Sequence, residues 1–200
     1  MEHIYKKGQA GHPVFVLLHG TGGDEHSLLQ VANFLDADAT YLAIRGDVKE
    51  NGMNRYFKRY SDGSYDEEDL YMRGDSLMKF IEEMSQTYGF DLGDVVLVGF
   101  SNRANIAVNL LLQDDSKINK GILMSPLYSI DTSHLTQSKE NVNVFISMGR
   151  HDPICSVEES EHVVSLFADR GANVEEFWGD SHEVTVEILE AAREWLETLK

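Results

Sequence analysis

Short, continuous apolar runs recur along the chain and are separated by polar or glycine-containing segments. Continuous runs, as opposed to alternating ones, are typical of strands that are buried on both faces of a sheet. We expect a short edge strand at residues 3–5 and further strands at residues 13–18, 40–44, 94–98, 121–124, 142–148 and 173–178.

Between these runs the apolar residues recur at intervals of three and four, which predicts amphipathic helices. We expect helices at residues 28–35 (with Asp24 as its cap), from Asp66 to residue 88, and at residues 102–112, 156–169 and 184–199. The apolar stripe of the last helix consists of Val184, Ile188, Ala191, Ala192, Trp195 and Leu199. Alternating strands and helices predict a single α/β domain over residues 1–200, with a mostly parallel central sheet and helices on both faces.

Two connections bear on how open a site would be. The segment between Met124 and Val142 is too short for a large helical lid, so we expect none. The polar, glycine-containing segment 51–65 is expected to be a loop without regular structure, and loops of that length are often functional. We expect Met53, Tyr56 and Phe57 of this loop to line the acyl or alcohol pocket.

The chain has 200 residues and a formal net charge of −17. This charge argues against nucleic acid and anionic membrane surfaces as partners, and it gives a strongly anionic substrate no inducement to approach. No apolar run is long enough to span a bilayer, and the first residues lack the apolar core of a secretory signal. Cys155 is the only cysteine, which fits a reducing compartment, and we expect a cytoplasmic protein.

The chemistry is expected around residues 95–107, V-V-L-V-G-F-S-N-R-A-N-I-A. A buried strand that breaks at a glycine and restarts as a helix would hold Ser101 on a tight, strained turn at a helix N-terminus. This is the arrangement of a nucleophile elbow, although the usual final glycine of G-x-S-x-G is replaced by Arg103. The alternative is that Ser101 only caps an ordinary helix.

A nucleophilic serine needs a base, and the base needs an acid that orients it. In the elbow architecture the acid and then the histidine follow the serine along the chain, at the ends of later strands. Asp152 and His182 satisfy that order; Asp131 is a weaker acid, and His162 is expected on a helix surface. The alternative for Asp152 and His182 is that they only cap the helices they precede.

Two backbone N–H groups would stabilise an oxyanion. We expect one from Asn102 and the other from Thr21, in the loop after the strand at 13–18. Gly22 and Gly23 in this loop would let the backbone approach a substrate closely. The loop lacks the glycine spacing and the lysine of phosphate-binding loops, so we expect no nucleotide site.

A metal site could be imagined around His19, Asp24 and His26. The chain has no H-E-x-x-H pattern, and lone histidines are more often hydrogen-bonded structural residues, so we expect no metal. Cys155 has no elbow of its own, and we expect it to pack in the interior.

Five motifs in order resemble a known family: L-L-H-G-T-G-G-D-E-H, R-G-D-V-K-E-N-G-M-N-R-Y-F, G-F-S-N-R-A-N-I-A, D-P-I-C and S-H-E-V. They are similar to the small bacterial carboxylesterase/phospholipase group of α/β-hydrolases. Within it they most resemble hydrolases associated with hydroquinone and quinone stress, which are related to acyl-protein thioesterases and dienelactone hydrolases. The resemblance implies a lidless α/β-hydrolase fold, a triad of Ser101, His182 and Asp152, and oxyanion donors at Thr21 and Asn102.

Two positions depart from this family's pattern, which has glycine where Arg103 and Ser181 stand here. Arg103 bears on the geometry of the elbow, and we expect its side chain to leave along the helix surface. Ser181 bears on how the loop that carries His182 is held.

The sequence therefore predicts a serine hydrolase that cleaves small carboxylic esters or thioesters through an acyl-enzyme, without a cofactor. The expected partner is a small-molecule substrate, and the sequence leaves open whether the chain forms a homodimer. The alternative is a non-catalytic protein that binds small ligands on the same fold. The expected substrate-binding residues are Gly22, Gly23, Met53, Tyr56, Phe57 and Ile154.

Overall fold

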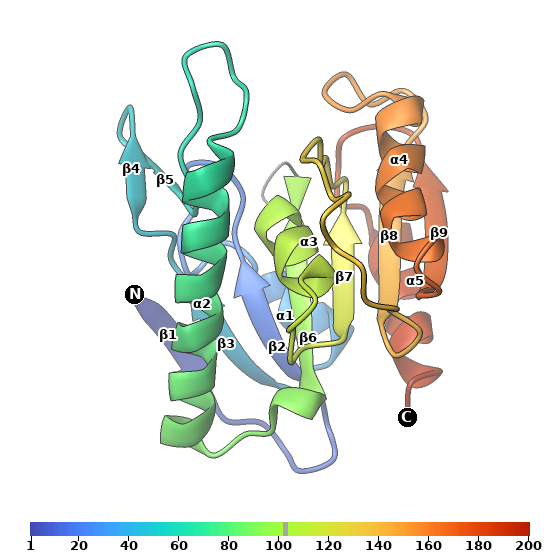
Figure 1. Ribbon diagram of the computed structural model, residues 1–200. Coiled ribbons are helices and arrows are strands. Elements are labelled where there is room, and N and C mark those ends of the chain that lie inside the picture. Colours follow the sequence, from blue (N-terminus) through green and yellow to red (C-terminus); the bar gives the residue numbers. More distant parts are fainter. Residues whose placement is uncertain (102–103) are drawn as a thin grey trace.

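The computed structural model describes residues 1–101 and 104–200, and it is built on a twisted central sheet (Figure 1). The strand order in this sheet is β1-β3-β2-β6-β7-β8-β9. Every neighbouring pair is parallel except β1 and β3, which are antiparallel. The strands are β1 (His3–Lys6), β2 (Val14–Leu18), β3 (Thr40–Ile44), β6 (Val95–Phe100), β7 (Lys120–Met124), β8 (Asn143–Gly149) and β9 (Asn173–Gly179).

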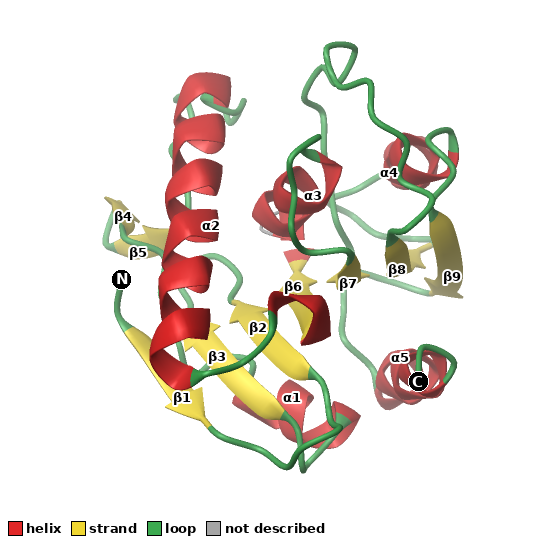
Figure 2. Ribbon diagram, turned by 60° about the horizontal axis from the view of Figure 1, so that its bottom comes forward, coloured by secondary structure: helices red, strands yellow, loops and turns green. Residues whose placement is uncertain are grey.

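Helices cover both faces of the sheet (Figure 2). They are α1 (Leu29–Leu35), α2 (Glu67–Tyr88), α3 (Ala104–Leu112), α4 (Val157–Ala168) and α5 (Val186–Glu197), with a short 3-10 turn, η1 (Leu92–Asp94), before β6. Helices α2, α3 and α4 lie on one face, and α1 and α5 lie on the other. This arrangement confirms the predicted mostly parallel α/β sheet.

The continuous apolar runs are explained by the two hydrophobic cores that these layers enclose. Successive side chains of a strand point to opposite faces of the sheet. In β2, Val14, Val16 and Leu18 enter the core beneath α2, α3 and α4, whereas Phe15 and Leu17 enter the core beneath α1 and α5. A strand that feeds both cores therefore has no polar face.

The first helix begins later than the sequence predicts, and its expected cap is wrong. Helix α1 begins at Leu29, and its N-cap residue Leu28 makes no side-chain capping bond. The Asp24 carboxylate instead accepts a hydrogen bond from the His26 N–H at 2.9 Å, which closes a tight turn before the helix. Asp66, by contrast, caps α2 as its position suggests, since it accepts from the N–H of Asp69.

The segment expected to be an irregular loop contains a β-hairpin, so that prediction is wrong. Strands β4 (Val48–Glu50) and β5 (Met53–Arg55) pair antiparallel. The turn residues between them have positive φ angles, 51° at Asn51 and 76° at Gly52. An Asn-Gly pair with two positive φ angles is the preferred turn of a two-residue hairpin.

The segment from residue 125 to residue 142 contains no helix, so the described chain has no large lid. The helices among the described residues are also too short or too polar to cross a membrane.

Candidate active site

Ser101 stands at the carboxyl end of β6, between the ends of β2 and β7. Its φ angle is 66°, in the left-handed region that costs a residue with a side chain free energy. Gly99 permits this turn, because a Cβ there would lie 2.9 Å from Cα of Ala104 in α3. The glycine thus lets α3 start close against the strand. Asn102 and Arg103, for which we expect an oxyanion donor and an outward side chain, lie outside the described residues.

His182 lies between Ser101 and Asp152 and contacts both. Its Nε2 is 2.7 Å from the Ser101 Oγ, and its Nδ1 is 2.7 Å from the Asp152 Oδ2. A carboxylate only accepts hydrogen bonds, so Nδ1 carries the proton and Nε2 is left to accept one from the serine hydroxyl. The predicted nucleophile and the predicted acid, which lie 81 and 30 residues before His182 in sequence, are therefore joined to this predicted base in one chain of hydrogen bonds.

Asp152 is held firmly in this chain. Its side chain is 1% exposed, and that of His182 is 11% exposed. The second carboxylate oxygen, Oδ1, accepts hydrogen bonds from the backbone N–H groups of Ile154, at 2.7 Å, and Cys155, at 3.1 Å. The carboxylate thus has partners on both oxygens and a fixed orientation toward the imidazole.

The structure also gives the surroundings of the alternatives that the sequence leaves open. Asp131 is exposed, and its carboxylate accepts hydrogen bonds from the backbone N–H and the hydroxyl of Ser133. Helix α4 is capped by Ser156, and α5 is capped by Thr185. Neither Asp152 nor His182 is therefore needed as a cap.

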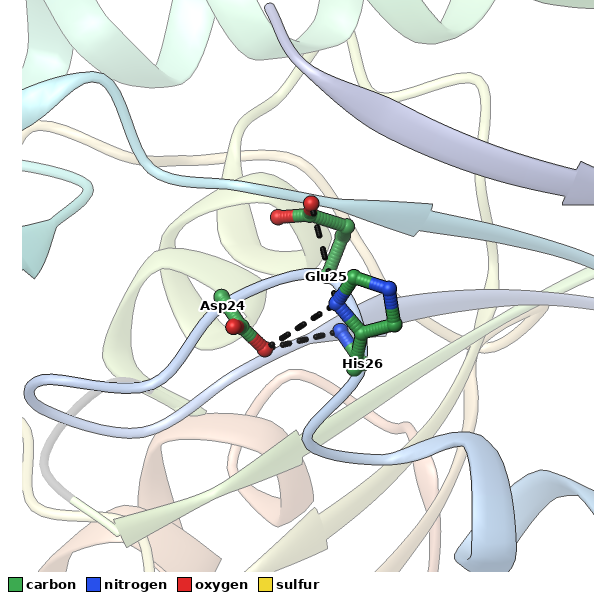
Figure 3. Close-up of side chains that lie close together, drawn as sticks. All are labelled: Asp24, Glu25 and His26. Atoms are coloured by element: carbon green, nitrogen blue, oxygen red, sulfur yellow. Dashed lines mark hydrogen bonds and ion pairs between the residues drawn. The ribbon is translucent and has the colours of Figure 1, made fainter.

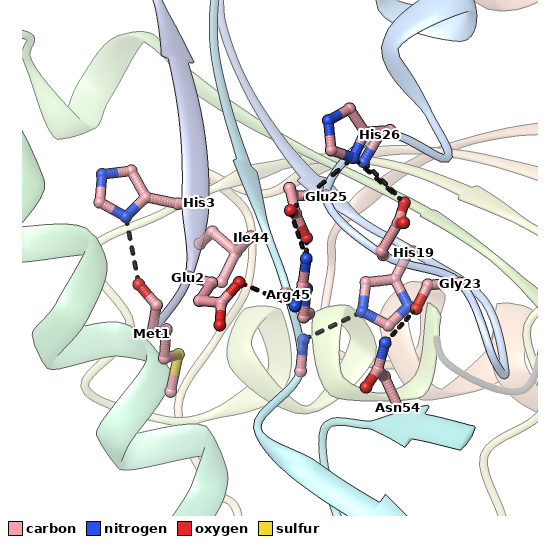
Figure 4. Close-up of polar contacts among 12 residues, drawn as sticks. Met1, Glu2, His3, His19, Gly23, Glu25, His26, Ile44, Arg45 and Asn54 are labelled. Atoms are coloured by element: carbon pink, nitrogen blue, oxygen red, sulfur yellow. Dashed lines mark hydrogen bonds and ion pairs between the residues drawn. The ribbon is translucent and has the colours of Figure 1, made fainter. Parts of the chain in front are cut away.

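The loop after β2, residues 19–23, is the predicted oxyanion loop, and several bonds hold it. Asn54 accepts from the Gly22 N–H at 3.3 Å and donates from its side chain to the Gly23 carbonyl at 2.9 Å (Figure 4). The buried ring of His19 accepts from the Gly46 N–H at 2.9 Å, so its other nitrogen donates to the Gly20 carbonyl at 2.7 Å. Thr21, between these anchors, is exposed, and its role as a donor stays a prediction.

With this geometry in hand, the chain can be compared with known proteins. A sequence profile described as Phospholipase/Carboxylesterase matches residues 1–200. The chain belongs to the phospholipase/carboxylesterase family. This confirms the resemblance that the five motifs carry.

Individual proteins are similar to the chain over nearly its whole length. A protein of Bacillus subtilis (strain 168) named "Putative hydrolase MhqD" is 44% identical over 196 residues, which are 98% of this chain and 97% of that protein. The crystal structure of the Bacillus cereus carboxylesterase superposes with a TM-score of 0.95 at 39% identity, covering 100% of this chain and 95% of that one. The structure of YahD with malic acid gives a TM-score of 0.93 at 28% identity, covering 100% and 99%.

The residues that the sequence predicts to contact substrate differ in exposure in this family member. Ile154 is 51% exposed beside Asp152, and the half-buried Met53 packs against Gly22. Tyr56 and Phe57 are only 2% and 3% exposed. Their roles in substrate binding stay predictions, as do those of Gly22 and Gly23.

Tyr56 has a structural role that sequence reasoning missed. Its hydroxyl donates to the Ile44 carbonyl at 2.6 Å and accepts from the His19 N–H at 3.2 Å. Burial raises the pKa of this phenol above its ordinary value, so the hydroxyl keeps its proton. Tyr56 therefore joins the end of β3 to the start of the predicted oxyanion loop from within the core.

Three side chains at the end of the same loop lie close enough to suggest a cation site (Figure 3). The Nδ1 of His26 is 3.6 Å from an oxygen of Asp24 and 3.7 Å from an oxygen of Glu25. The Glu25 carboxylate is already engaged by Arg45, whose Nε and Nη2 donate to its two oxygens at 2.5 and 2.6 Å (Figure 4). A metal would have to displace this guanidinium, so we keep the prediction that none is bound.

The Glu25–Arg45 pair makes stability depend on pH. The hydrogen bonds from Arg45 hold the pKa of Glu25 at about 2, against 4.5 for an unperturbed glutamate. Because the folded value is the lower one, the pair stabilises the fold above pH 4.5 and loses this effect as the pH falls toward 2.

We therefore expect Glu25→Gln to lower the Tm by a few degrees at pH 7 and by progressively less as the pH falls through this window. Thermal unfolding of both proteins across that range measures the difference. Glu175→Gln, which changes an exposed carboxyl on β9, serves as the control and should leave the Tm nearly unchanged. A difference that stays constant down to pH 2 would contradict the assignment.

Gly149 has a role in placing the histidine loop. It ends β8, and a Cβ at this position would lie 2.4 Å from the carbonyl oxygen of Ser181, the residue before His182. With such a Cβ, the loop that carries His182 could not stay where it is, because the atoms of Ser181 that the Cβ would meet belong to the backbone. Ser181 is thus packed through its backbone against a glycine on the neighbouring strand.

We expect Gly149→Ala to lower kcat/KM for a small ester by about 100-fold, since a shift of about 1 Å at a reacting group can cost that much. Gly179→Ala is the matched control: Gly179 pairs with Gly149 across β8 and β9, but a Cβ there meets nothing closer than 3.8 Å. Equal losses in the two variants would show that the effect is general destabilisation of the strand pair.

Proposed function

We propose that this esterase-family protein is a serine hydrolase that cleaves small carboxylic esters or thioesters through an acyl-enzyme on Ser101. The observation that carries the proposal is the position of His182, with one ring nitrogen 2.7 Å from the Ser101 hydroxyl and the other 2.7 Å from the Asp152 carboxylate. A nucleophilic serine must contact its base, and that base must contact the acid that orients it.

The chemistry follows from the protonation states. As the Ser101 Oγ attacks the substrate carbonyl carbon, its proton passes to His182 Nε2, and the buried Asp152 carboxylate stabilises the imidazolium. When the bond from carbon to the leaving oxygen or sulfur breaks, this proton passes to the departing alcohol or thiol. Water then attacks the acyl-enzyme, gives a proton to the same nitrogen, and releases the acid as Ser101 regains its hydrogen.

The charge on the carbonyl oxygen needs donors that are already in place. We assign this role to the backbone N–H groups of Thr21 and Asn102. The bonds of Asn54 and His19 to residues 20–23 support the first, since they hold the loop that carries Thr21 in one conformation. No step in this mechanism requires a metal or an organic cofactor.

A small substrate suits the surroundings of Ser101. The described chain lacks a large lid, and the apolar side chains that we expect to meet substrate are Met53, on the short strand β5, and Ile154, in the loop before α4. Side chains in such positions can shield a short acyl or alcohol group.

A fluorophosphonate probe tests the proposal directly, because it reacts with serines that an adjacent base activates. We expect one adduct, located by peptide mass spectrometry on Ser101, and none in Ser101→Ala. Ser133→Ala, which removes an exposed hydroxyl bonded to Asp131, should label like the wild type. If the native protein is not labelled, a non-catalytic binding protein on the same fold becomes the better interpretation.

A further inference from the structure

The segment from Lys49 to Arg59 has a charge opposite to that of the chain as a whole. It contains four cationic residues, Lys49, Arg55, Lys58 and Arg59, and a single acidic residue, Glu50, within a protein of net charge −17. A local reversal of this kind is informative when the cations converge on one place.

This segment leaves the sheet at the same edge as Ser101. Strands β3 and β6 run parallel on either side of β2, and Ile44, Leu18 and Gly99 are in register. The segment follows β3 and Ser101 follows β6, so both emerge at the carboxyl end of the sheet, where α/β proteins bind ligands. Figure 1 shows β4, β5 and the loop that leads to α2 gathered beyond this end.

Two of the cations line a recess of about 240 Å³ between the hairpin and the loop that follows it. Around Arg55 and Arg59 the lining is polar and includes Glu50, Asn51, Tyr60 and Ser61. Guanidinium, hydroxyl and amide groups are the donors that hold a carboxylate or a phosphate in proteins.

Arg55 is built into the wall and has one buried donor without a partner. Its side chain is 12% exposed, and its Nε lies against the Glu50 carboxylate. Its Nη1 is buried and has no hydrogen-bond partner among the described residues. Burying a charged donor without an acceptor costs free energy, which an oxygen of a ligand would recover.

Arg59 forms another part of the wall, and its guanidinium carbon lies 5.7 Å from the centre of the Tyr65 ring. It forms no ion pair within residues 1–101 and 104–200. The Tyr65 hydroxyl accepts a hydrogen bond from the side chain of the buried Asn105 at 2.5 Å. Asn105 belongs to the first turn of α3, the helix that starts just after Ser101, so this wall is tied to the elbow.

The hairpin that carries Arg55 is tied to the predicted oxyanion loop. Met53 packs against Gly22, and Asn54 bonds both Gly22 and Gly23. Arg55 is two residues after Met53 on the same strand, so the two side chains share one face of the hairpin. The hairpin face that carries Met53 and Arg55 thus runs from the predicted oxyanion loop to the recess.

We propose that this recess binds a carboxylate carried by the substrate itself, so that the preferred substrates are half-esters or half-thioesters of dicarboxylic acids. The inference rests on the proposed hydrolase function and names its substrate class. Two guanidinium groups and one carboxylate give the recess a charge of +1 (2 − 1), which matches a single carboxylate. A phosphate monoester, with a charge of about −1.5 to −2 at pH 7, is matched less well.

The acidic surface of the protein does not conflict with this site. The net charge gives an anion no long-range attraction, and it lowers the rate of encounter. A bidentate contact to a guanidinium acts at hydrogen-bond distance, where screening by salt matters less than for separated surface charges. Contact with Arg55 and Arg59 therefore decides which substrate is retained.

The test compares esters that differ only in a terminal group. The p-nitrophenyl monoesters of succinate, glutarate and adipate are measured beside the butyrate, pentanoate and hexanoate esters, in which a methyl group replaces the carboxylate. The quantity followed is the ratio of kcat/KM for the anionic ester to that for its neutral counterpart. We expect Arg59→Gln to lower this ratio about tenfold for the spacer that fits best, as for the loss of a charge-assisted hydrogen bond.

Two further variants sharpen the comparison. Lys58→Gln removes the same charge from the adjacent residue, whose side chain is exposed outside the recess, and should leave the ratio unchanged. Glu50→Gln removes the negative charge from the recess and should raise the ratio. If Arg59→Gln and Lys58→Gln lower the ratio equally, or if neither changes it, the recess does not recognise the substrate carboxylate.

A binding measurement separates failure of this inference from failure of the proposed hydrolase. Calorimetric titration of glutarate into the Ser101→Ala protein, with and without Arg59→Gln, measures the affinity of the recess for a dicarboxylate without any turnover. Weaker binding in the double variant supports the anion site even if no ester is hydrolysed. Equal binding overturns it even if Ser101 proves to be the nucleophile.

Discussion

Replacing Ser101 by alanine is expected to lower kcat for a small ester by at least about 10⁴-fold, which amounts to loss of measurable hydrolysis. In the proposed mechanism the Ser101 hydroxyl oxygen forms the bond to the acyl group. The His182 Nε2, which lies 2.7 Å from this oxygen, accepts its proton and does not take its place. The measurement is the initial rate of hydrolysis of a p-nitrophenyl ester, corrected for the uncatalysed rate.

The same substitution should leave the fold intact. Alanine keeps the Cβ, so the strained φ of 66° at this position costs about the same in both proteins. Equal Tm values and circular dichroism spectra would establish this, and Ser133→Ala should retain full activity. A well-folded Ser101→Ala protein that still hydrolyses the ester would remove Ser101 from the mechanism.

Most of the fold could be predicted because its signals are local. The strands are buried on both faces, so residues such as Phe15 and Val16 form one uninterrupted apolar run although they enter different cores. The order of Ser101, Asp152 and His182 was informative for a related reason. Parallel strands bring their carboxyl ends to one edge, so residues at three strand ends meet however far apart they are in sequence.

The hairpin of β4 and β5 has a local signal in the sequence, but that signal is weakened by its surroundings. The Asn51–Gly52 dipeptide is the strongest short-range sign of a two-residue hairpin, yet the flanking strands have only three residues each and no clear alternation. The wrong cap at Asp24 arose similarly. An aspartate can close a tight turn through its own side chain instead of starting a helix, and both outcomes look alike in sequence.

Other features of the site depend on contacts that no local pattern contains. The pairing of Glu25 with Arg45 and the packing of Gly149 against Ser181 join residues about 20 to 30 positions apart through the tertiary fold. The same holds for Phe100, whose ring centre lies 5.3 Å from that of His182. Knowing the strand order is not enough to predict them, since each depends on the path of a loop.

The second large effect is expected at His182. In His182→Ala the Ser101 hydroxyl loses the acceptor for its proton, so kcat/KM should fall nearly as far as in Ser101→Ala. His162→Ala is the matched control, because His162 is exposed on α4 and should tolerate the change without loss of rate. If His162→Ala lost activity and His182→Ala kept it, the assignment of His182 as the base would be wrong.

The double variant Ser101→Ala/His182→Ala makes this prediction sharper. Residues that act as one unit are strongly non-additive, so the double variant should be hardly slower than either single variant. Two independent contributions would instead multiply, and the residual rate of the double variant would fall far below that of each single one. Near-equality of all three residual rates therefore indicates that Ser101 and His182 perform one proton-coupled step, as their hydrogen bond implies. Multiplying losses would mean that the serine can attack without this histidine.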